Sequence, residues 1–366
     1  MSTPQNELKY FNAFNLFPEI GAVRLKKLLN YFPNMETAWQ AGAYELRQAG
    51  LDEKIAQKIS EEKKRINPDK EFEKLAKEGI SIITIQDDQY PKLLKEIYDP
   101  PTILYIKGLF KPKDDFALAI VGTRKPTMYG ARVAEEFSHK LSTAGLTIVS
   151  GMALGIDTIA HKAALQAGNR TIAVLGSGLD RQNIYPISNL HLSDIISEKG
   201  ALISEYPIGT KAMPYHFPAR NRIISGLSLG TLIIEATEKS GTFLTANHAL
   251  DQGRQIFAVP GPIYSQQSAG PNKLIKMGAK LVTNIDDILE DLNLKSATQR
   301  QEARQIIPDS EEEKLVLEVL AAEPIHIDKI ITATKLDTAV VGSTLSLMEI
   351  KGKVKNLGGM NYVIAR

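Results

Sequence analysis

The residues best suited to chemistry in this chain are glycine, serine and threonine at the ends of short apolar runs. The runs ALAIV and LTIV are followed by GTR at 122–124 and SG at 150–151. The run TIAVL is followed by GSG at 176–178, and the run TLIIEAT is followed closely by SGT at 240–242. Loops of this kind at a helix start expose backbone N–H groups and the positive end of the helix dipole, which bind anions. Several such loops on one edge of a sheet indicate a row of phosphates.

Positively charged side chains accompany these loops. Arg124 lies three residues after the first run, and Arg220 and Arg222 flank Asn221. Because guanidinium groups bind phosphate through paired hydrogen bonds, this spacing indicates a phosphate clamp. The candidate binding residues are Gly122, Thr123, Arg124, Ser150, Gly151, Gly155, Gly176, Gly178, Arg181, Arg220, Asn221, Arg222, Ser240, Gly241 and Thr242.

A structural role is the alternative interpretation of the arginines. One of them can pair with a carboxylate such as Asp157 or Glu235 and join two loops, and both roles can hold at once. Asp157 opens a helical pattern and is interpreted as an N-cap rather than a catalytic acid. His161 follows one turn later, but GxSxG is absent and the six histidines show no metal-binding spacing. We expect no catalytic residue, no metal and no cofactor.

Aromatic residues lie in or beside the same loops, namely Tyr129, Tyr185, Phe217 and Phe243. Aromatic rings interleaved with cations are typical of single-strand binding, in which bases stack while phosphates are held. For any one ring, covering the sheet edge is an equal alternative. The chain has no GxxxxGK[ST] motif, and GSGLD lacks the third glycine of the dinucleotide motif. We therefore do not expect ATP or NAD as ligands.

The repeating pattern of the chain predicts its architecture. Residues 1–69 space apolar residues three and four apart, which predicts a helical domain of SAM-like or helix-hairpin-helix-like type. Its central hairpin has only Gly21 where two glycines are usual, so a scaffold role is favoured over DNA binding. Residues 70–292 alternate near-continuous apolar runs with helical patterns. This predicts an α/β domain with an extended Rossmann-like, doubly wound and mostly parallel sheet.

The end of the chain predicts a third domain. Residues 293–308 are a polar linker, and residues 309–366 hold three helical patterns and a hairpin that turns at Gly358-Gly359. Three helices and a hairpin indicate a winged-helix-like domain. Its third helix carries no basic residue, whereas base-reading helices use Arg, Lys, Asn or Gln. A protein-docking or structural role is therefore favoured.

The composition limits the environment and the partners. The chain has 366 residues, no cysteine and a formal net charge of +2. It therefore has neither disulfides nor cysteine metal sites, which fits a reducing compartment. No signal pattern or transmembrane run is found, so we expect a cytoplasmic protein without a membrane partner. Because the net charge is small, any nucleic-acid partner requires local concentration of basic groups.

Taken in order, these motifs resemble the DNA-processing protein A (DprA/Smf) family over about residues 80–290. The resemblance is carried by GTR…YG, SGMALGID, AVLGSGLD…YP, FPARNRIISGLS, EA…SGT…TA and PGP…GPNKLI. It implies an extended Rossmann-like fold and a homodimer that is not an enzyme. It also implies that the protein binds single-stranded DNA during natural transformation, protects it and loads the RecA recombinase.

The resemblance also implies roles for individual residues. Arg124 is expected to contact a DNA phosphate, with Gly122, Ser150, Gly151 and residues 240–242 lining the groove and residues 220–222 supporting it. Many relatives carry a basic residue directly after YP, but here Ile187 stands there. Arg181, in the same loop, is a candidate substitute. Glu235, at the end of its strand, is expected to hold one arginine in place.

Two other functions were weighed. Rossmann-like hydrolases that cleave nucleoside monophosphates at the N-glycosidic bond use PGGxGTxxE, and LSLGTLIIEA shares Gly230, Thr231 and Glu235 with that motif. However, residues 227–229 are LSL instead of PGG, and the glutamate comes one position late. A purely structural or docking module leaves the glycine loops unexplained. Single-stranded DNA binding is therefore the favoured hypothesis.

Overall fold

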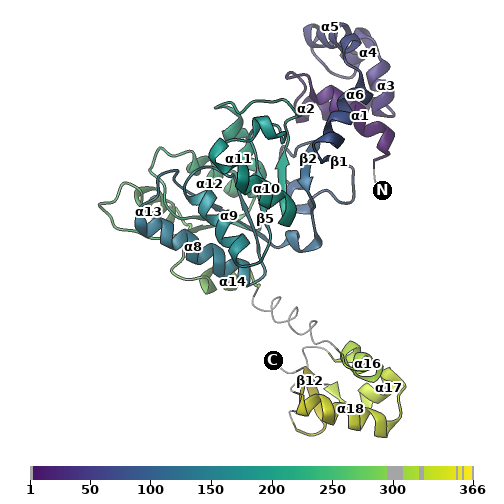
Figure 1. Ribbon diagram of the computed structural model, residues 1–366, viewed down its shortest axis with the longest axis vertical. Coiled ribbons are helices and arrows are strands. Elements are labelled where there is room, and N and C mark those ends of the chain that lie inside the picture. The colour runs from purple at the N-terminus through teal and green to yellow at the C-terminus, as the bar shows by residue number, and fades with distance from the viewer. Residues whose placement is uncertain (1–2, 295–307, 321–324, 352, 357, 365–366) are drawn as a thin grey trace. The chain divides into compact units, whose positions relative to one another are not determined.

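The computed structural model describes residues 3–294, 308–320, 325–351, 353–356 and 358–364. Most of the predicted linker, 293–308, therefore lies outside the described residues. The chain forms two compact units, Met1–Ile288 and Leu289–Arg366, which are drawn in Figure 1 and described separately. No helix within the described ranges combines the length and the apolarity that crossing a membrane requires.

The first unit is built on a nine-stranded sheet in the order β1-β2-β6-β5-β4-β3-β7-β8-β9. Only the β1/β2 and β2/β6 pairs are antiparallel among these strands. This confirms the predicted mostly parallel α/β sheet, although its first two strands were not predicted. The strands are β1 Ile80–Thr84, β2 Ile103–Gly108, β3 Ala117–Val121, β4 Thr147–Ser150, β5 Thr171–Val174, β6 Ala201–Ser204, β7 Gly230–Ile233, β8 Gln255–Ala258 and β9 Lys280–Leu281.

Helices connect the parallel strands. The chain moves outward from β3 through β4, β5 and β6, then returns to the other side of β3 with β7. The strand order therefore reverses between β3 and β7, which is where doubly wound sheets bind ligands. The helices between these strands are α8 Met128–Thr143, α9 Ile156–Gln166, α10 Leu190–Lys199, α11 His216–Gly226, α12 Thr242–Asp251 and α13 Ala269–Lys276. In addition, α7 Lys92–Lys95 lies between the antiparallel β1 and β2, and α14 Asp286–Asp291 follows β9.

Apolar side chains shared between α11 and β3 determine which face of the sheet the helix covers. Ala117, Ala119 and Val121 alternate along β3 and share one apolar cluster with Ile223 and Ile224 of α11. Alternate residues of a strand point to the same face, so this face of β3 packs on the helix. The apolar packing holds the first turn of α11 beside the carboxyl ends of the strands.

The N-terminal helices pack on the same unit. Phe11, Phe14 and Leu28 share one apolar cluster with Ile80 and Tyr105 of the sheet. The Tyr105 hydroxyl donates a hydrogen bond to Asn12 Oδ1 at 2.9 Å. The boundary expected at residue 69 falls inside α6, which contacts both α1 and β1. The helices are α1 Gln5–Asn15, α2 Ala22–Tyr31, α3 Met35–Gln40, α4 Ala43–Gln48, α5 Glu53–Glu62 and α6 Pro68–Lys77.

The second unit has the predicted winged-helix arrangement of three helices and a hairpin. Its core includes Val316, Ile330, Val341 and Leu345, which are fully buried. A short strand, β10, adds to the predicted hairpin to give the sheet order β10-β12-β11. The elements are α16 Glu311–Val319, β10 Ile325–His326, α17 Ile327–Thr334, α18 Thr338–Ile350, β11 Val354–Asn356 and β12 Asn361–Ile364.

Candidate nucleic-acid interface

A cavity of about 570 Å³ opens at the carboxyl edge of the sheet, beside the reversal between β3 and β7. Its walls are the loops after β3, β4 and β7, Tyr185 of the loop after β5, the start of α12, and one side of α11 with the segment before it. We call it the strand-end cavity. Of the predicted binding residues, it brings together Gly122, Thr123, Arg124, Arg220, Asn221, Ser240, Gly241 and Thr242.

Arg124 supplies an available positive charge at this cavity. Its side chain is exposed, and its guanidinium carbon lies 5.6 Å from the centroid of the Phe217 ring. A cation at this distance over an aromatic face is attracted by the ring. No carboxylate of the described residues lies within ion-pair distance of Arg124. The guanidinium therefore lies beside the ring in an exposed residue.

The loop that carries Arg124 is fastened to the end of β7. The Thr123 N–H donates to the Glu235 carbonyl at 2.6 Å, and the Glu235 carboxylate accepts from the Thr127 N–H at 2.9 Å and hydroxyl at 2.6 Å. Gly130 makes room for this carboxylate, because a Cβ there would lie 2.2 Å from Glu235 Oε2. The interpretation that Glu235 holds an arginine is therefore wrong, since this carboxylate is bound to Thr127.

The predicted clamp of two arginines is also wrong. Both lie within α11, and helical residues two positions apart point to opposite sides. Arg220 Nη1 donates to the carbonyls of Gly151, at 2.7 Å, and of Val174. Arg222 instead pairs with Asp99 at 2.8 Å and Glu205 at 2.6 Å, outside the strand-end cavity. Arg220 therefore joins strand ends beside the cavity, and Arg222 joins other loops.

Arg220 and Asp157 form the buried floor of the cavity. Asp157 Oδ2 accepts from the N–H groups of Gly151 at 3.1 Å and Ala153 at 3.4 Å, which fastens the loop after β4. Burial raises the pKa of Asp157 to about 6, although the Arg220 charge opposes this rise. Burial also lowers the pKa of Arg220 to about 10. The cap residue of α9 is Gly155, so Asp157 is not the N-cap that was expected.

The remaining predicted residues after β4 are structural in their contacts. Ser150 is fully buried and its hydroxyl donates to the Ile120 carbonyl at 2.6 Å. A Cβ at Gly151 would lie 2.6 Å from the Arg220 guanidinium. Gly155 has a φ of +80°, and a Cβ there would lie 2.4 Å from the Thr123 carbonyl oxygen. These residues permit close packing of the loops after β3 and β4.

Three predicted binding residues after β5, namely Gly176, Gly178 and Arg181, lie outside the lining of the strand-end cavity. Gly176 and Gly178 are buried, and a Cβ at Gly176 would lie 3.1 Å from the Phe217 ring. Arg181 is exposed and pairs with Asp194 at 2.9 Å, beside a different and smaller hollow. The structure therefore does not bring Arg181 to Arg124, and its candidacy as a substitute for the missing basic residue stays a prediction.

Two of the four aromatic rings line the cavity. Tyr185 and Phe217 lie with ring centroids 5.6 Å apart, and Tyr185 is 49% exposed. The Tyr129 hydroxyl donates to the Pro260 carbonyl at 2.8 Å, and neither Tyr129 nor Phe243 is in the lining. The lining also includes Pro214, Thr237, Leu244 and Thr245, which the sequence analysis did not select. In the sequence, these four residues are marked only by lying near the FPARN and SGT motifs.

Comparison with known proteins places these features in a family. Residues 81–293 match a family model described as DNA recombination-mediator protein A, and residues 300–360 match the DprA winged helix domain. Protein Smf from Synechocystis sp. is 34% identical over 98% of this chain and 98% of its own. DNA processing protein DprA from Bacillus subtilis is 46% identical over 59% of this chain and 72% of its own.

Solved structures agree with the sequence matches. DNA processing protein A from Streptococcus pneumoniae superposes with a TM-score of 0.65 at 36% identity, covering 79% of this chain and 98% of that chain. DNA processing protein A from Helicobacter pylori superposes with a TM-score of 0.53 at 32% identity, covering 59% of this chain and 96% of that chain. The latter structure is described as showing a single-stranded DNA binding mode. The predicted resemblance is confirmed, and this chain belongs to the DNA recombination-mediator protein A family.

Proposed function

We propose that this protein binds single-stranded DNA in the strand-end cavity. Arg124 and the backbone N–H groups around Gly122 and at the start of α12 hold phosphates, and bases stack on Tyr185 and Phe217. The observation that carries the proposal is the exposed Arg124 guanidinium, which lies over the Phe217 ring at the mouth of this cavity. A cation beside a stacking ring is the combination that single-strand binding uses.

Two properties of binding follow from this arrangement. Backbone N–H groups and one guanidinium contact phosphates, which carry no sequence information, so sequence preference is low. A base that stacks on Phe217 must leave its partner strand, so duplex DNA binds less well. The support from relatives is the Helicobacter pylori structure, which is described by its binding of single-stranded DNA.

The proposed mechanism makes and breaks no covalent bond. A glycosidic hydrolase of the PGGxGTxxE type needs a glutamate that reaches the sugar. Here the Glu235 side chain accepts two hydrogen bonds from Thr127, and the residue is 1% exposed. Its carboxylate therefore stabilises the Arg124 loop, and this observation counts against the hydrolase alternative.

We further propose that this binding protects incoming DNA and loads the RecA recombinase during natural transformation, with the protein acting as a cytoplasmic homodimer. Family membership supports this part of the proposal. Its test is the rate of RecA filament formation on a single strand that is precoated with a competing single-strand binding protein. The rate should rise with this protein and stay unchanged with an Arg124→Ala variant.

The binding itself is tested by fluorescence anisotropy of a labelled single-stranded oligonucleotide. Unlabelled single strands of different sequence should displace the label equally well, and duplex of the same length should displace it poorly. Nucleoside monophosphates should not displace it. Absence of strand binding, together with binding or cleavage of a monophosphate, would overturn the proposal and favour the hydrolase.

A further inference from the structure

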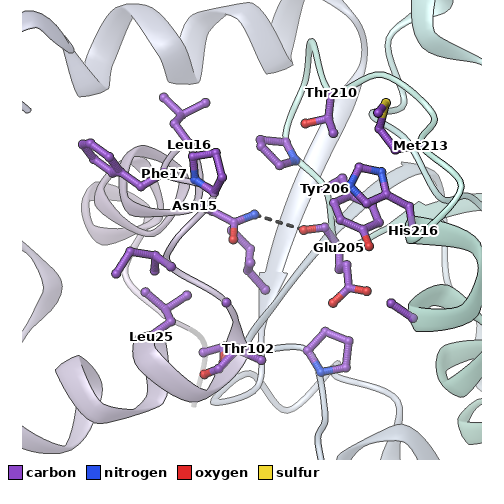
Figure 2. Close-up of a pocket in the computed structure, with 18 of the residues that line it drawn as sticks. Asn15, Leu16, Phe17, Leu25, Thr102, Glu205, Tyr206, Thr210, Met213 and His216 are labelled. Carbon is purple, nitrogen blue, oxygen red and sulfur yellow. Dashed lines mark hydrogen bonds between the residues drawn. The ribbon is translucent and has the colours of Figure 1, made fainter. Parts of the chain in front are cut away.

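A second cavity, of about 420 Å³, lies between the N-terminal helices and the end of β6 (Figure 2). We call it the β6-end cavity. One wall comes from the end of α1, the segment after it and the start of α2, and the other from the loop between β6 and α11. Residues that face the cavity from the two sides include Asn15, Phe17, Leu25, Glu205, Tyr206, Thr210, Met213 and His216. None of the predicted binding residues is in its lining.

The β6-end cavity continues the edge on which the strand-end cavity lies. Because β2 runs antiparallel to β6, Thr102 and Ile103 at the start of β2 lie at the carboxyl end of β6. The start of α11 divides the two cavities. Pro214 and Phe217 line the strand-end cavity, whereas Met213, Tyr215 and His216 line the β6-end cavity. A strand that follows this edge away from Phe217 therefore passes from one cavity to the other.

Aromatic rings give the β6-end cavity stacking surfaces. The Tyr206 and His216 rings are stacked with centroids 4.0 Å apart, and the Tyr215 ring meets His216 edge-on at 4.6 Å. Tyr215 is 66% exposed. A large exposed ring beside a cavity, outside the apolar core, is the arrangement that takes up a base. The volume is also in the range of small-ligand sites, roughly 300–1,000 Å³.

One buried acceptor of this cavity has no donor. Glu205 Oε2 accepts from Arg222 at 2.6 Å, but Glu205 Oε1 is buried without a hydrogen-bond partner among the described residues. A buried polar atom without a partner costs free energy, so such an atom indicates a donor that arrives with a ligand or water. Every unpaired nucleobase presents an N–H group on its pairing edge, and a duplex hides that group.

The opposite wall is fixed to the sheet. The Asn15 side chain donates to the Glu205 carbonyl at 3.0 Å, the dashed line of Figure 2, and to the Tyr105 hydroxyl at 3.2 Å. These bonds hold the end of α1 against the end of β6. The N-terminal helices therefore form a preformed wall of the cavity.

We propose that the β6-end cavity binds an unpaired nucleobase of the same DNA strand whose phosphate is held at Arg124. This inference rests on the proposed function and extends it, because it makes the N-terminal helices part of the binding surface. The sequence analysis favoured a scaffold role for these helices. The strand then occupies two stacking sites, with the first turn of α11 between them.

Photo-cross-linking tests this directly. An oligonucleotide of about 20 nucleotides that carries a photoreactive thymidine analogue is irradiated on the full-length protein, and cross-linked peptides are identified by mass spectrometry. Cross-links are expected at Tyr185 or Phe217 and also at Met213 or Tyr215. Cross-links confined to Tyr185 and Phe217 would overturn the inference and leave the proposed function intact. A free nucleotide that binds the β6-end cavity while the strand gives no cross-link there would also overturn it.

Affinity measurements on two variants give an independent readout. Tyr215→Ala removes an exposed ring, and Gly21→Phe fills the cavity from a position where a Cβ meets nothing within 4 Å. Each should weaken binding of an oligonucleotide of about 20 nucleotides by about tenfold and leave one of about 6 nucleotides little changed. Tyr44→Ala is the control, since Tyr44 is 68% exposed and lines neither cavity.

The outcomes separate this inference from the function on which it rests. If wild type, Tyr215→Ala and Gly21→Phe bind the longer oligonucleotide with equal affinity, the proposed base site in the β6-end cavity is overturned. In that case, weak binding of both lengths by an Arg124→Ala variant would still support DNA binding in the strand-end cavity. Failure of the wild-type protein to bind either length would overturn both.

Discussion

The guanidinium carbon of Arg124, in the loop after β3, lies 5.6 Å from the centroid of the Phe217 ring, in the first turn of α11. The loop after β3 and the helix α11 are far apart in sequence, and each is held by hydrogen bonds from another segment. Glu235 holds the Arg124 loop, and Arg220 holds α11 to the ends of β4 and β5. A phosphate-binding cation and a base-stacking ring are thus positioned before any ligand arrives.

The stacking role of Phe217 predicts the effect of Phe217→Leu. Loss of one stacked base costs about 1–3 kcal/mol, so the dissociation constant for a single strand should rise by roughly 5- to 150-fold. The salt dependence of binding should stay the same, because no phosphate contact is removed. Anisotropy titrations at two salt concentrations measure both quantities. Tyr129→Leu is the control, since Tyr129 is outside the cavity lining; equal affinity of Phe217→Leu and wild type would contradict the stacking role.

The hydrogen bonds from Thr127 to the Glu235 carboxylate predict the effect of Glu235→Gln. The neutral amide loses the charge of the carboxylate, and its NH₂ group can bond the Thr127 hydroxyl only if that hydroxyl turns to accept, so the free energy of unfolding should fall by about 1 kcal/mol. Single-strand affinity should fall as well, because the Arg124 loop loses its anchor. Urea denaturation and anisotropy measure the two effects. Glu238→Gln is a matched control, since Glu238 is 59% exposed and its partner Lys273 is 3.7 Å away. Unchanged stability of Glu235→Gln would show that the anchor is unimportant.

The close approach of Gly151 to Arg220 predicts a steric effect. In Gly151→Ala the new Cβ would lie 2.6 Å from the guanidinium, so the free energy of unfolding should fall by about 1–3 kcal/mol. Gly241→Ala is the matched control, because a Cβ there meets nothing within 4 Å and stability should change little. Thermal or urea denaturation of both variants distinguishes them. Equal stability of Gly151→Ala and wild type would mean that Arg220 is not fixed at this position.

The raised pKa of Asp157 predicts a pH dependence of stability. Its folded pKa is about 6, against an ordinary value of 3.8. A raised pKa contributes stability below about pH 4, and that contribution is lost as the pH rises through about 6. Asn cannot titrate, so the stability of wild type relative to Asp157→Asn should fall by about 2 kcal/mol between about pH 4 and pH 7. Urea denaturation at several pH values measures this difference. A difference that stays constant or rises with pH would contradict the assignment.

The sequence predicted the parallel part of the sheet because buried parallel strands are near-continuously apolar, as in ALAIV and TIAV. It missed β1 and β2, which are the antiparallel strands. In β2 the apolar run ILYI is followed directly by Lys107 and Gly108, without the strand-then-helix repeat that marked the others. The convergence of the loops after β3 and β7 was predictable, since carboxyl ends of parallel strands meet at one edge.

The contacts of the arginines were not predictable from motif spacing alone. Arg220 and Arg222 were interpreted as a phosphate clamp around Asn221, whereas these residues are inside α11, and helical periodicity sends the two arginines to opposite sides. Their partners come from distant segments: Gly151 for Arg220, and Asp99 and Glu205 for Arg222. Such pairings depend on tertiary packing. The β6-end cavity was missed for the same reason, because its two walls are formed by segments far apart in the sequence.

The most direct test of the account is the salt dependence of single-strand binding by wild type, Arg124→Ala and Arg181→Ala. Removal of a phosphate contact should weaken binding by roughly 10- to 100-fold and reduce the slope of log affinity against log salt by about 0.7. Arg181→Ala tests the predicted substitute: a slope reduced by a similar amount would support a phosphate contact at Arg181, and an unchanged slope would leave Arg181 with only its pairing to Asp194, 2.9 Å away. Arg124→Ala that binds with wild-type affinity and slope would contradict the central claim that Arg124 holds a DNA phosphate.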